Sequence, residues 1–586
     1  MLNNYNDSNF HSINEKNISI NINNEVSKTN KPIIITTALP YANGEIHIGH
    51  ISSTYLPADI FTRFLRISQQ LVFHICASDD FGTPIIIKAE KENKKPEEFV
   101  AYWNKRDIED FSAIGISFDK FCQTSSKENQ VFVQNVFNKL LDNGHIYEKE
   151  IVQFYCEFDK KFLPDRYVVG ICPYCKSDDQ YSDLCEKCGR VPEEILDPKC
   201  GICGKPPMKK RSNHYFFKLS SFSDELKEWL NSNNNLQQDI KNYVLYWINE
   251  GLQDWDITRD LDWGISIPLE KAKGKVFYGW FDNHLCYIST FNTLIKERFK
   301  SKGKDIWNKS LIYHFIGKDI IYHHFLFLPA IRMGINQEYK LPNYIPVRGH
   351  LMLYNKKLSK SRNWYISLKD FILKFNPDFL RFYIASISPS NQDDINFDWD
   401  IFYSKINNEL IDNIGNFINR TLSFTKKNFN GIVPEPSIYD QDDNNAIDSI
   451  TNISKDTGKF LLDTETDKAL KNILKFSNFF NQYFQKKQPW NNRDTSSTTI
   501  YISINAVRTL AILLAPFIPH SAEKIWLQLS NNKSNLWEQS WNDSSILKIE
   551  PGHKIGKHFP IFKKIEKTEI EKEKIKLGKN GMLSIQ

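Results

Sequence analysis

The chain has 586 residues, more than one hydrophobic core usually serves, so we expect a multidomain protein. Its 75 basic and 70 acidic residues leave a formal net charge of +5, which is too small for a protein that coats DNA but allows a local basic face for a polyanion. No segment holds about twenty uninterrupted apolar residues, so a membrane span is not expected. These features favour a soluble protein.

The first segment, 1–30, is polar, rich in Asn and Ser, and lacks the basic start and apolar run of a secretory signal. We therefore expect a flexible tail and a cytoplasmic protein. The cysteines agree with that location, because three Cys-x-x-Cys pairs lie between Cys172 and Cys203. In a reducing compartment such pairs indicate metal ligation rather than disulfides.

The segment 31–143 has the pattern of the first half of an α/β domain. A β-branched stretch at 32–38 predicts a buried parallel strand, and apolar residues at helical spacing follow a turn-rich segment. A second strand is predicted at 71–77, with later strands at 313–316 and 345–348. This alternation predicts a doubly wound, Rossmann-like parallel sheet.

Three other segments depart from that pattern. Residues 144–218 hold the cysteine pairs and several Pro/Gly turns, so we expect a subdomain inserted before the second half of the α/β domain, 219–398. From 399 to 562 the apolar residues follow a helical period, which predicts an all-α bundle. The Lys/Glu-rich end, 563–586, is typical of a solvated helix or tail.

Two histidines, His47 and His50, stand at the predicted strand-to-helix junction. Such a junction favours phosphate, because a helix N-terminus presents unpaired N–H groups. Gly49 between them would let a nucleotide approach the backbone closely. A His-x-x-His pair alone is equally well explained by a surface turn with two unrelated histidines.

Far downstream, the stretch Lys357-Leu-Ser-Lys-Ser361 places two lysines and two hydroxyls in a loop. Lysines in such a loop can meet a polyphosphate, although a Lys/Ser loop by itself is more often a solvated surface. The presence of both motifs in one chain favours the nucleotide interpretation of each.

Together these motifs resemble the signatures of class I aminoacyl-tRNA synthetases, His-Ile-Gly-His and Lys-Met-Ser-Lys-Ser, the second of which has Leu in place of Met here. Four longer stretches are similar to the methionyl-tRNA synthetase family: Ala-Leu-Pro-Tyr-Ala-Asn-Gly at 38–44, Phe-Leu-Pro-Asp-Arg at 162–166, Trp-Asp-Ile-Thr-Arg-Asp at 255–260 and His-Phe-Ile-Gly-Lys-Asp at 314–319. The resemblance extends from about residue 31 to about residue 563. The related valine, isoleucine and leucine enzymes carry a large editing domain, for which the interval between the two motifs is too short.

The resemblance implies a methionine–tRNA ligase. Such an enzyme converts L-methionine and ATP to methionyl-adenylate and pyrophosphate, then transfers methionine to the 3′ end of tRNA(Met), including the initiator. Magnesium is expected with the ATP. The implied catalytic residues are His47, His50 and Lys360, with Lys357 in support, and ATP would contact His47, Gly49, His50 and Lys360.

The resemblance also implies a methionine pocket with Asp79 on the ammonium group. Its residues would be Leu39, Tyr41, Asp79, Trp280, Tyr287, Ile320 and His324. Here the chain departs from the family, since the usual Trp-x-Asp-Ala-Pro reads Trp-Phe-Asp-Asn283-His284 and His323 stands where an aromatic ring is common. Buried polar groups need partners, so these replacements predict weaker methionine binding or altered discrimination.

Two metal sites are predicted in the insert. The first has the spacing of a tetrahedral, structural zinc site with four thiolates: Cys172, Cys175, Cys185 and Cys188. The second is left open, because Cys200 and Cys203 supply only half of it. Cys156 and Asp159 could complete it, with Asp159 where some relatives have a cysteine.

In the predicted bundle, Asn416 and Arg420 share one helix face, and Trp490 follows another helix. All three match positions that read the anticodon in methionyl-tRNA synthetases, where amide and guanidinium groups hydrogen-bond base edges and an indole stacks on a base. The chain ends at Gln586 without the C-terminal oligonucleotide-binding domain that supports dimerisation in many relatives, so a monomer is expected.

Two other functions are left open. A class I synthetase of drifted amino-acid specificity is suggested by Asn283 and His284, and amino-acid-dependent pyrophosphate exchange would distinguish it. A non-catalytic tRNA-binding relative would keep the fold but form no adenylate, and the intact His47, His50 and Lys360 argue against it.

Overall fold

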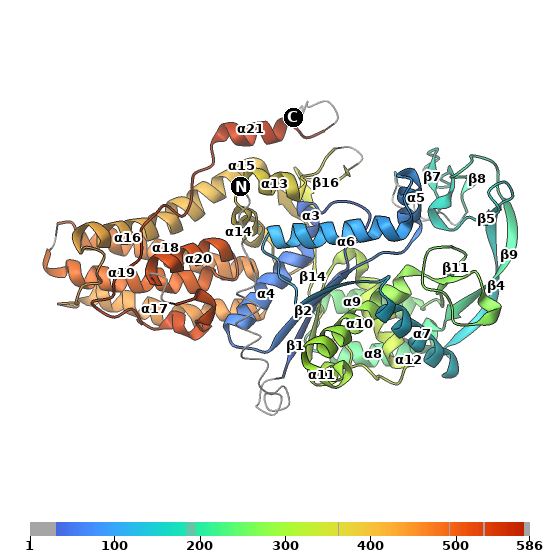
Figure 1. The fold of residues 1–586 in the computed structure, drawn as a ribbon, viewed down its shortest axis with the longest axis horizontal. Coiled ribbons are helices and arrows are strands. Elements are labelled where there is room, and N and C mark those ends of the chain that lie inside the picture. The colour runs from blue at the N-terminus through green and yellow to red at the C-terminus, as the bar shows by residue number, and fades with distance from the viewer. Residues whose placement is uncertain are drawn as a thin grey trace.

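The computed structural model describes residues 31–578, apart from gaps at 183–184, 186, 189–191, 193, 361–362, 492 and 531–533. The expected tail at 1–30, Ser361 of the Lys/Ser loop and the final residues, 579–586, lie outside the described residues. Figure 1 shows a helical bundle at one end, an α/β domain in the centre and an inserted β-rich unit at the other end.

A five-stranded parallel sheet forms the centre of the α/β domain, in the order β14-β13-β1-β2-β3. Its strands are β1 (Ile33–Thr37), β2 (Val72–Ser78), β3 (Lys120–Gln123), β13 (Leu311–Gly317) and β14 (Val347–Arg348). β1 comes first in the chain but lies in the middle of the sheet, so the strand order reverses beside it. Ligands of such sheets bind at the carboxyl ends of the strands at this reversal. The predicted doubly wound α/β fold is confirmed.

Strand β1 shows why the sheet is buried on both faces. All five of its residues are buried, and successive side chains point to opposite sides. Ile33 and Ile35 join the core that contains Ile60 of α4 (Leu56–Ile67), whereas Ile34 joins the core that contains Phe291 of α10 (Gly279–Phe299). β-branched residues on both faces are typical of a parallel strand covered by helices.

The remaining helices of the α/β domain surround this sheet. They are α3 (Ile48–His50), α5 (Thr83–Lys91), α6 (Pro96–Ala113), α7 (Lys127–Asp142), α8 (Ser223–Ser232), α9 (Gln238–Glu250), α11 (Gly303–Lys309), α12 (Leu328–Gly334), α13 (Leu368–Lys374) and α14 (Pro377–Ile387). Two π-helical segments interrupt them, η1 (Ile51–Tyr55) and η6 (His323–Phe327). A small sheet of β15 (Leu351–Leu353), β16 (Lys356–Lys357) and β17 (Ile395–Phe397) carries the start of the Lys/Ser loop.

The insert consists of two small sheets. A long antiparallel pair, β4 (Ile146–Cys156) and β9 (Met208–Phe217), is extended by β5 (Lys161–Phe162) and β10 (Trp255–Asp256). The second sheet contains β6 (Val168–Ile171), β7 (Gln180–Tyr181) and β8 (Leu196–Cys200), and it carries Cys-x-x-Cys pairs. A separate pair joins β11 (Thr258–Arg259) to β12 (Val276–Phe277).

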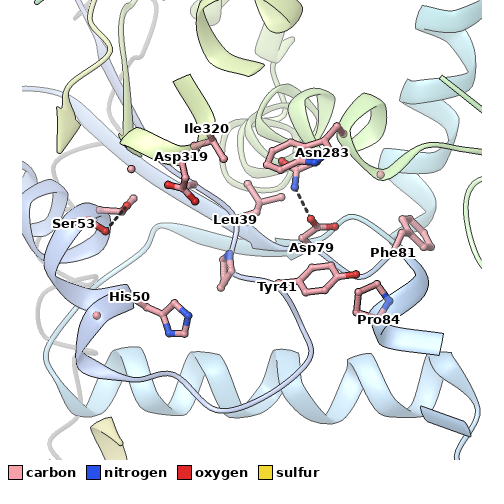
Figure 2. A pocket seen from close by; sticks show the side chains of 18 of the residues that line it. Leu39, Tyr41, His50, Ser53, Asp79, Phe81, Pro84, Asn283, Asp319 and Ile320 are labelled. Atoms are coloured by element: carbon pink, nitrogen blue, oxygen red, sulfur yellow. Dashed lines mark hydrogen bonds between the residues drawn. The ribbon is translucent and has the colours of Figure 1, made fainter. Parts of the chain in front are cut away.

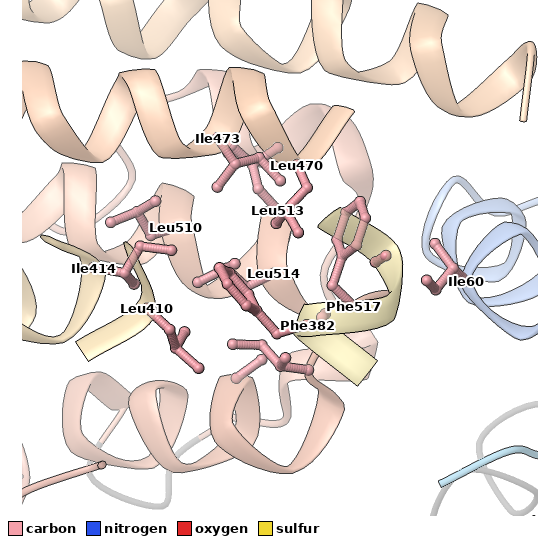
Figure 3. Close-up of a cluster of buried hydrophobic side chains, with 14 of the residues drawn as sticks. Ile60, Phe382, Leu410, Ile414, Leu470, Ile473, Leu510, Leu513, Leu514 and Phe517 are labelled. Carbon is pink, nitrogen blue, oxygen red and sulfur yellow. The ribbon is translucent and has the colours of Figure 1, made fainter. Parts of the chain in front are cut away.

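The helical region follows β17, as predicted. Its helices are α15 (Trp399–Ser404), the π-helix η8 (Lys405–Gly415), α16 (Asn416–Asn428), α17 (Gln441–Leu462), α18 (Thr466–Lys487), α19 (Arg493–Leu514) and α20 (Pro519–Ser530). Within α19, the stretch Thr495–Leu514 is the one helix of the described residues long and apolar enough to cross a membrane, but 89% of its apolar window is buried inside the protein. Figure 3 shows that Leu510, Leu513 and Leu514 of this helix lie in the bundle core, which explains its composition.

The C-terminal segment returns to the α/β domain. After the bundle the chain runs to α21 (Lys567–Ile575), which packs against α15 (Figure 1). Ion pairs join Lys374 to Glu573 at 2.9 Å and Lys574 to Asp400 at 2.6 Å. The helix has the Lys/Glu composition expected of a solvated element, but it is docked through those ion pairs and through Ile570, which is fully buried in the core.

Candidate active site

A cavity of about 850 Å³ opens at the carboxyl ends of β1 and β13, where the strand order reverses. Most of the predicted nucleotide and amino-acid residues line it: Leu39, Tyr41, His47, Gly49, His50, Asp79, Trp280, Tyr287, Ile320, His324 and Lys357. Figure 2 shows His50 and Ser53 on one side and Tyr41, Asp79 and Phe81 on the other. The cavity has the size of an ordinary small-molecule site.

The two histidines are held by the start of the helix that follows β1. His47 caps α3, since its Nδ1 accepts the Gly49 N–H at 3.2 Å, and His50 Nδ1 accepts the backbone N–H of His47 at 3.1 Å. The two rings stack with their centroids 3.7 Å apart. Because each Nδ1 is an acceptor, each neutral ring carries its proton on Nε2.

Burial keeps both imidazoles neutral. It lowers the pKa of His47 to about 3, with a further contribution from the charge of Lys360. It also lowers the pKa of His50 well below its usual value, with contributions from His47 and Lys360. At neutral pH the pair therefore offers two preorganised N–H donors to an anion.

The Lys/Ser loop lies directly against this helix start. A Cβ atom on residue 49 would lie 2.4 Å from Leu358 Cδ1 and 3.0 Å from the His47 ring, so any larger residue would require the Leu358 side chain to shift. The close approach expected at Gly49 is thus made by the loop itself. A nucleotide contact at Gly49 remains a prediction.

The two lysines of the loop take different positions. Lys357 ends β16 and lines the cavity, whereas Lys360 Nζ donates to the Glu45 carbonyl oxygen at 2.6 Å. Partial burial and the charge of Lys88 lower the pKa of Lys360. Just after the loop, Ser367 Oγ donates to Glu45 Oε2 at 2.6 Å. Two motifs far apart in the sequence are therefore joined through the segment around Glu45.

Asp79 follows β2 and lies beside Tyr41 in the cavity (Figure 2). Its Oδ2 accepts a 2.8 Å hydrogen bond from Asn283 Nδ2, and its Oδ1 has no hydrogen-bond partner among the described residues. Burial raises the pKa of Asp79 to about 7, an effect that the Asn283 hydrogen bond opposes and the charge of Asp80 increases. A bound cation at Oδ1 would favour the ionised form.

Aromatic and imidazole rings form the adjoining wall. Trp280 stacks on His323 with the centroids 3.8 Å apart. Tyr287 Oη lies 3.0 Å from His324 Nε2, and His324 Nδ1 lies 3.1 Å from the Ile320 carbonyl oxygen. Burial lowers the pKa of His324 to about 4, so the ring is neutral. Its Nδ1–H donates a hydrogen bond to the Ile320 carbonyl oxygen, and its Nε2 accepts a hydrogen bond from the Tyr287 hydroxyl.

The three departures from the family pattern behave differently. Asn283 is hydrogen-bonded to Asp79, and His323 keeps a flat ring against Trp280. His284 is fully buried, and neither of its ring nitrogens has a partner among the described residues. Burial lowers the pKa of His284 well below its usual value. Such an unpaired polar ring costs about 1–3 kcal/mol of stability.

Two arginines that the sequence analysis left unassigned also line the cavity, Arg166 and Arg259. Each lies in a stretch that resembles the methionyl-tRNA synthetase family, Arg166 in 162–166 and Arg259 in 255–260. That resemblance was the feature of the sequence from which their place in the site could have been predicted. The Arg259 guanidinium lies 4.0 Å from the Tyr278 ring centroid. The cavity wall therefore carries two guanidinium groups besides Lys357, and one of them, Arg259, pairs with Asp256 at 3.3 Å.

The insert brings together the two predicted groups of metal-binding side chains. In each group the candidate ligand atoms lie within 4.8 Å of one another: Cys172, Cys175, Cys185 and Cys188, and separately Cys156, Asp159, Cys200 and Cys203. Sulfur pairs in the first group are 3.8 Å (Cys172–Cys188) and 3.6 Å (Cys175–Cys185) apart. Zn–S bonds of about 2.3 Å at tetrahedral angles place two sulfurs about 3.8 Å apart, so the first group fits zinc.

The second group has one carboxylate among three thiols. Asp159 Oδ2 lies 3.0 Å from Cys156 Sγ and 3.1 Å from Cys200 Sγ, and Cys156 and Cys203 sulfurs are 3.5 Å apart. These separations suit a Cys3Asp tetrahedron, which is an allowed zinc ligand set. The residues of both groups could thus hold a metal ion.

The predicted anticodon residues lie on the surface of the bundle. Arg420 is within reach of Trp490, with 5.8 Å between the guanidinium carbon and the ring centroid, and it donates to Gln485 Oε1 at 3.2 Å. Asn416 lies one helical turn earlier and donates to Asn481 at 3.4 Å. Trp490 is 45% exposed, so its ring has a face available for stacking. The three side chains form one patch at the ends of α16 and α18, far along the chain from the cavity residues.

This parallel sheet, with paired imidazoles at its reversal point and a lysine loop over them, is the catalytic architecture of class I aminoacyl-tRNA synthetases. The family model for class I tRNA synthetases (M) matches residues 33–422, and the model for the anticodon binding domain of methionyl tRNA ligase matches residues 433–580. The chain belongs to the methionyl-tRNA synthetase family.

Individual relatives agree with this assignment. The chain is 43% identical to the methionine–tRNA ligase of Methanobrevibacter smithii over 94% of its own length and 82% of the relative's. It is 41% identical to that of Methanopyrus kandleri, over 92% and 81%. A solved structure of Mycobacterium tuberculosis methionyl-tRNA synthetase in complex with methionyl-adenylate shares the fold, with a TM-score of 0.74 at 23% identity over 91% of this chain and 99% of that chain.

Proposed function

We propose that the chain is a methionine–tRNA ligase that activates L-methionine with ATP and transfers it to tRNA(Met). One observation carries the proposal: the His47–His50 pair and Asp79 line one cavity at the sheet reversal, beneath the lysine loop. This arrangement places donors for a polyphosphate next to an acceptor for an ammonium group. The family relationship points to methionine among the amino acids.

In the activation step, a carboxylate oxygen of methionine attacks the α-phosphorus of ATP, and the bond to the pyrophosphate oxygen breaks. Negative charge develops on the phosphate oxygens and on the leaving pyrophosphate. The Nε2–H groups of His47 and His50 and the ammonium groups of Lys357 and Lys360 would stabilise that charge. Catalysis of this kind depends on positioning and fixed positive groups, and removing one typically costs about 10² to 10³ in rate.

Asp79 and the ring wall would hold the amino acid. Oδ1 of Asp79, which has no hydrogen-bond partner among the described residues, would accept a hydrogen bond from the ammonium group. Trp280 and Tyr287 would enclose the thioether, which packs favourably against aromatic rings. Methionine then lies with its carboxylate toward the His47–His50 pair.

The metal ions have separate roles. Zinc would be held by the four-cysteine group and by the Cys3Asp group, where it would tie the turns of the insert together with no position left for substrate. Magnesium would enter with ATP and neutralise part of the polyphosphate charge. The anticodon would meet Asn416, Arg420 and Trp490 at the far end of the molecule.

The test is pyrophosphate exchange by the purified protein with methionine and, in parallel, with leucine, isoleucine, valine and cysteine. We expect exchange with methionine. Lys360→Ala should lower the rate about 10² to 10³-fold. Lys356→Ala is the matched control. Lys356 is an exposed lysine at the start of the same loop, and its ammonium group lies over the Trp364 ring.

Each contrary outcome has a distinct meaning. Exchange driven by another amino acid would identify a synthetase of drifted specificity, for which the buried polar residues Asn283 and His284 provide a structural reason. Binding of tRNA without exchange by any amino acid, with zinc and magnesium supplied, would identify a non-catalytic relative.

A further inference from the structure

The Asn283 amide occupies a position that the usual alanine of the family leaves apolar. Asn283 lies in the first turns of α10 and is only 3% exposed. Its Nδ2 donates to Asp79 Oδ2 at 2.8 Å, the dashed line in Figure 2. The two residues are 204 positions apart in the chain, so the bond joins the loop after β2 to helix α10.

This hydrogen bond occupies only one of the two carboxylate oxygens of Asp79 and thereby fixes the orientation of the carboxylate. Oδ2 is occupied by the amide, while Oδ1 has no hydrogen-bond partner among the described residues. A carboxylate can rotate about its Cβ–Cγ bond, and a donor on one oxygen fixes that rotation. The oxygen left without a partner, Oδ1, is itself buried and is therefore held in one direction at the cavity wall.

We propose that Asn283 is a positioning residue that orients the Asp79 carboxylate, so that Oδ1 receives the ammonium group of the amino-acid substrate. The inference rests on the proposed function, since it assumes an amino acid in this cavity. Asn283 itself acts through Asp79 and does not touch the reacting atoms.

The charges around Asp79 explain why such a donor matters. Burial and the neighbouring carboxylate of Asp80 oppose ionisation of Asp79, and the Asn283 amide opposes that effect. Asp282 on α10 is a second buried carboxyl close enough to interact with Asp79, and Tyr287 on the same helix is a third acidic group. With acidic neighbours around it, Asp79 has two hydrogen-bond donors that favour its charged form, the Asn283 amide and the backbone N–H of Phe81, and the amide is the one that a side-chain substitution removes.

The experiment compares the wild-type protein, Asn283→Ala and Asn283→Asp in methionine-dependent pyrophosphate exchange between pH 6 and 9. For Asn283→Ala we expect KM for methionine to rise about tenfold with kcat and KM for ATP nearly unchanged, because only binding of the ammonium group is affected. The acid limb of kcat/KM for methionine should move to higher pH, because the pKa of Asp79 rises when a donor is lost. Asn283→Asp, which places a carboxyl group where the amide was, should shift the acid limb of kcat/KM for methionine to still higher pH.

Asn292→Ala is the matched control. Asn292 lies on the same helix, and its Nδ2 donates to Tyr339 Oη at 3.0 Å, away from Asp79. The Asn292→Ala variant therefore loses an equivalent hydrogen bond but should keep the wild-type pH profile. If Asn283→Ala also keeps the wild-type KM and pH profile, Asn283 has no positioning role. If the wild-type protein shows no exchange with methionine, the proposed function fails, and this inference with it.

Discussion

At the scale of single residues, Gly49 links the two motifs of the nucleotide site. A Cβ atom there would meet Leu358 Cδ1 at 2.4 Å, and residue 49 lies inside helix α3, where alanine is otherwise favourable. We expect Gly49→Ala to move the Leu358 side chain and lower kcat for exchange by at most about tenfold, with KM for methionine little changed. The double variant Gly49→Ala/Leu358→Ala should recover part of the rate. A Gly49→Ala enzyme with wild-type kcat would show that this contact is not needed.

The residues of the cavity differ in how far the sequence could predict them. His47, His50 and Lys357 belong to short linear motifs, and the structure places all three at the cavity. The Asn283–Asp79 bond was not predictable, because it depends on the packing of α10 against the loop after β2. The polar departures were visible in the sequence, but only coordinates show that Asn283 is paired while His284 has no partner among the described residues.

At the scale of elements, His214 ties strand β9 to the strands beside it. Its ring is buried, with Nδ1 2.8 Å from Asp256 Oδ2 and Nε2 2.9 Å from Asp260 Oδ2. Burial lowers the pKa of His214, but the hydrogen bonds to Asp256 and Asp260 outweigh it and raise the pKa above 6.5. A raised pKa stabilises the fold fully below pH 6.5, and that contribution is lost as the pH rises through the folded-state value.

We therefore expect His214→Gln to lower the free energy of unfolding by about 1 to 3 kcal/mol at pH 6. The gap between variant and wild type should narrow as the pH rises above 6.5 and through the raised pKa of His214, because the wild-type ring then loses its proton. The difference in stability is followed by measuring the thermal unfolding temperatures of the variant and the wild type as a function of pH. A gap that stays constant with pH would mean that the His214 ring does not carry the charge.

Whether a segment forms a strand or a helix was predictable where its apolar residues follow a single period. The β-branched stretch at 32–38 and the helical period after residue 399 correspond to β1 and to the helices of the bundle. The π-helical segments η1, η6 and η8 were not predictable, because each departs only in its hydrogen-bond pattern from the longer helical stretch that contains it. Two of them border the cavity, with His50 before η1 and His324 within η6.

At the scale of the whole molecule, the bundle and the α/β domain share one continuous core. Figure 3 shows Ile60 of α4 and Phe382 of α14 near Phe517, which follows α19. The sequence could not predict this joint, because its polar residues resemble ordinary surface charges. Asp59 and Arg381 are in fact fully buried and 2.7 Å apart. Since α4 continues the helix that begins at His47, this joint lies on the same element as the histidines to which we assign catalysis.

Arg381 is one of the polar groups that connect the two halves at this joint. Its guanidinium pairs with Asp59 and donates to the carbonyl oxygens of Pro516 and Phe517, each at 2.8 Å. Arg381→Met leaves those carbonyls and part of the Asp59 charge unsatisfied, so we expect a loss of about 3 to 5 kcal/mol in stability. The cavity residues lie in the α/β domain and the predicted anticodon residues lie in the bundle, so we expect aminoacylation of tRNA to fall more than pyrophosphate exchange. Arg66→Met is the control, since Arg66 pairs with Asp119 inside the α/β domain at 2.7 Å. Equal losses in both reactions for Arg381→Met would mean that the joint supports the fold without aligning the bundle with the cavity.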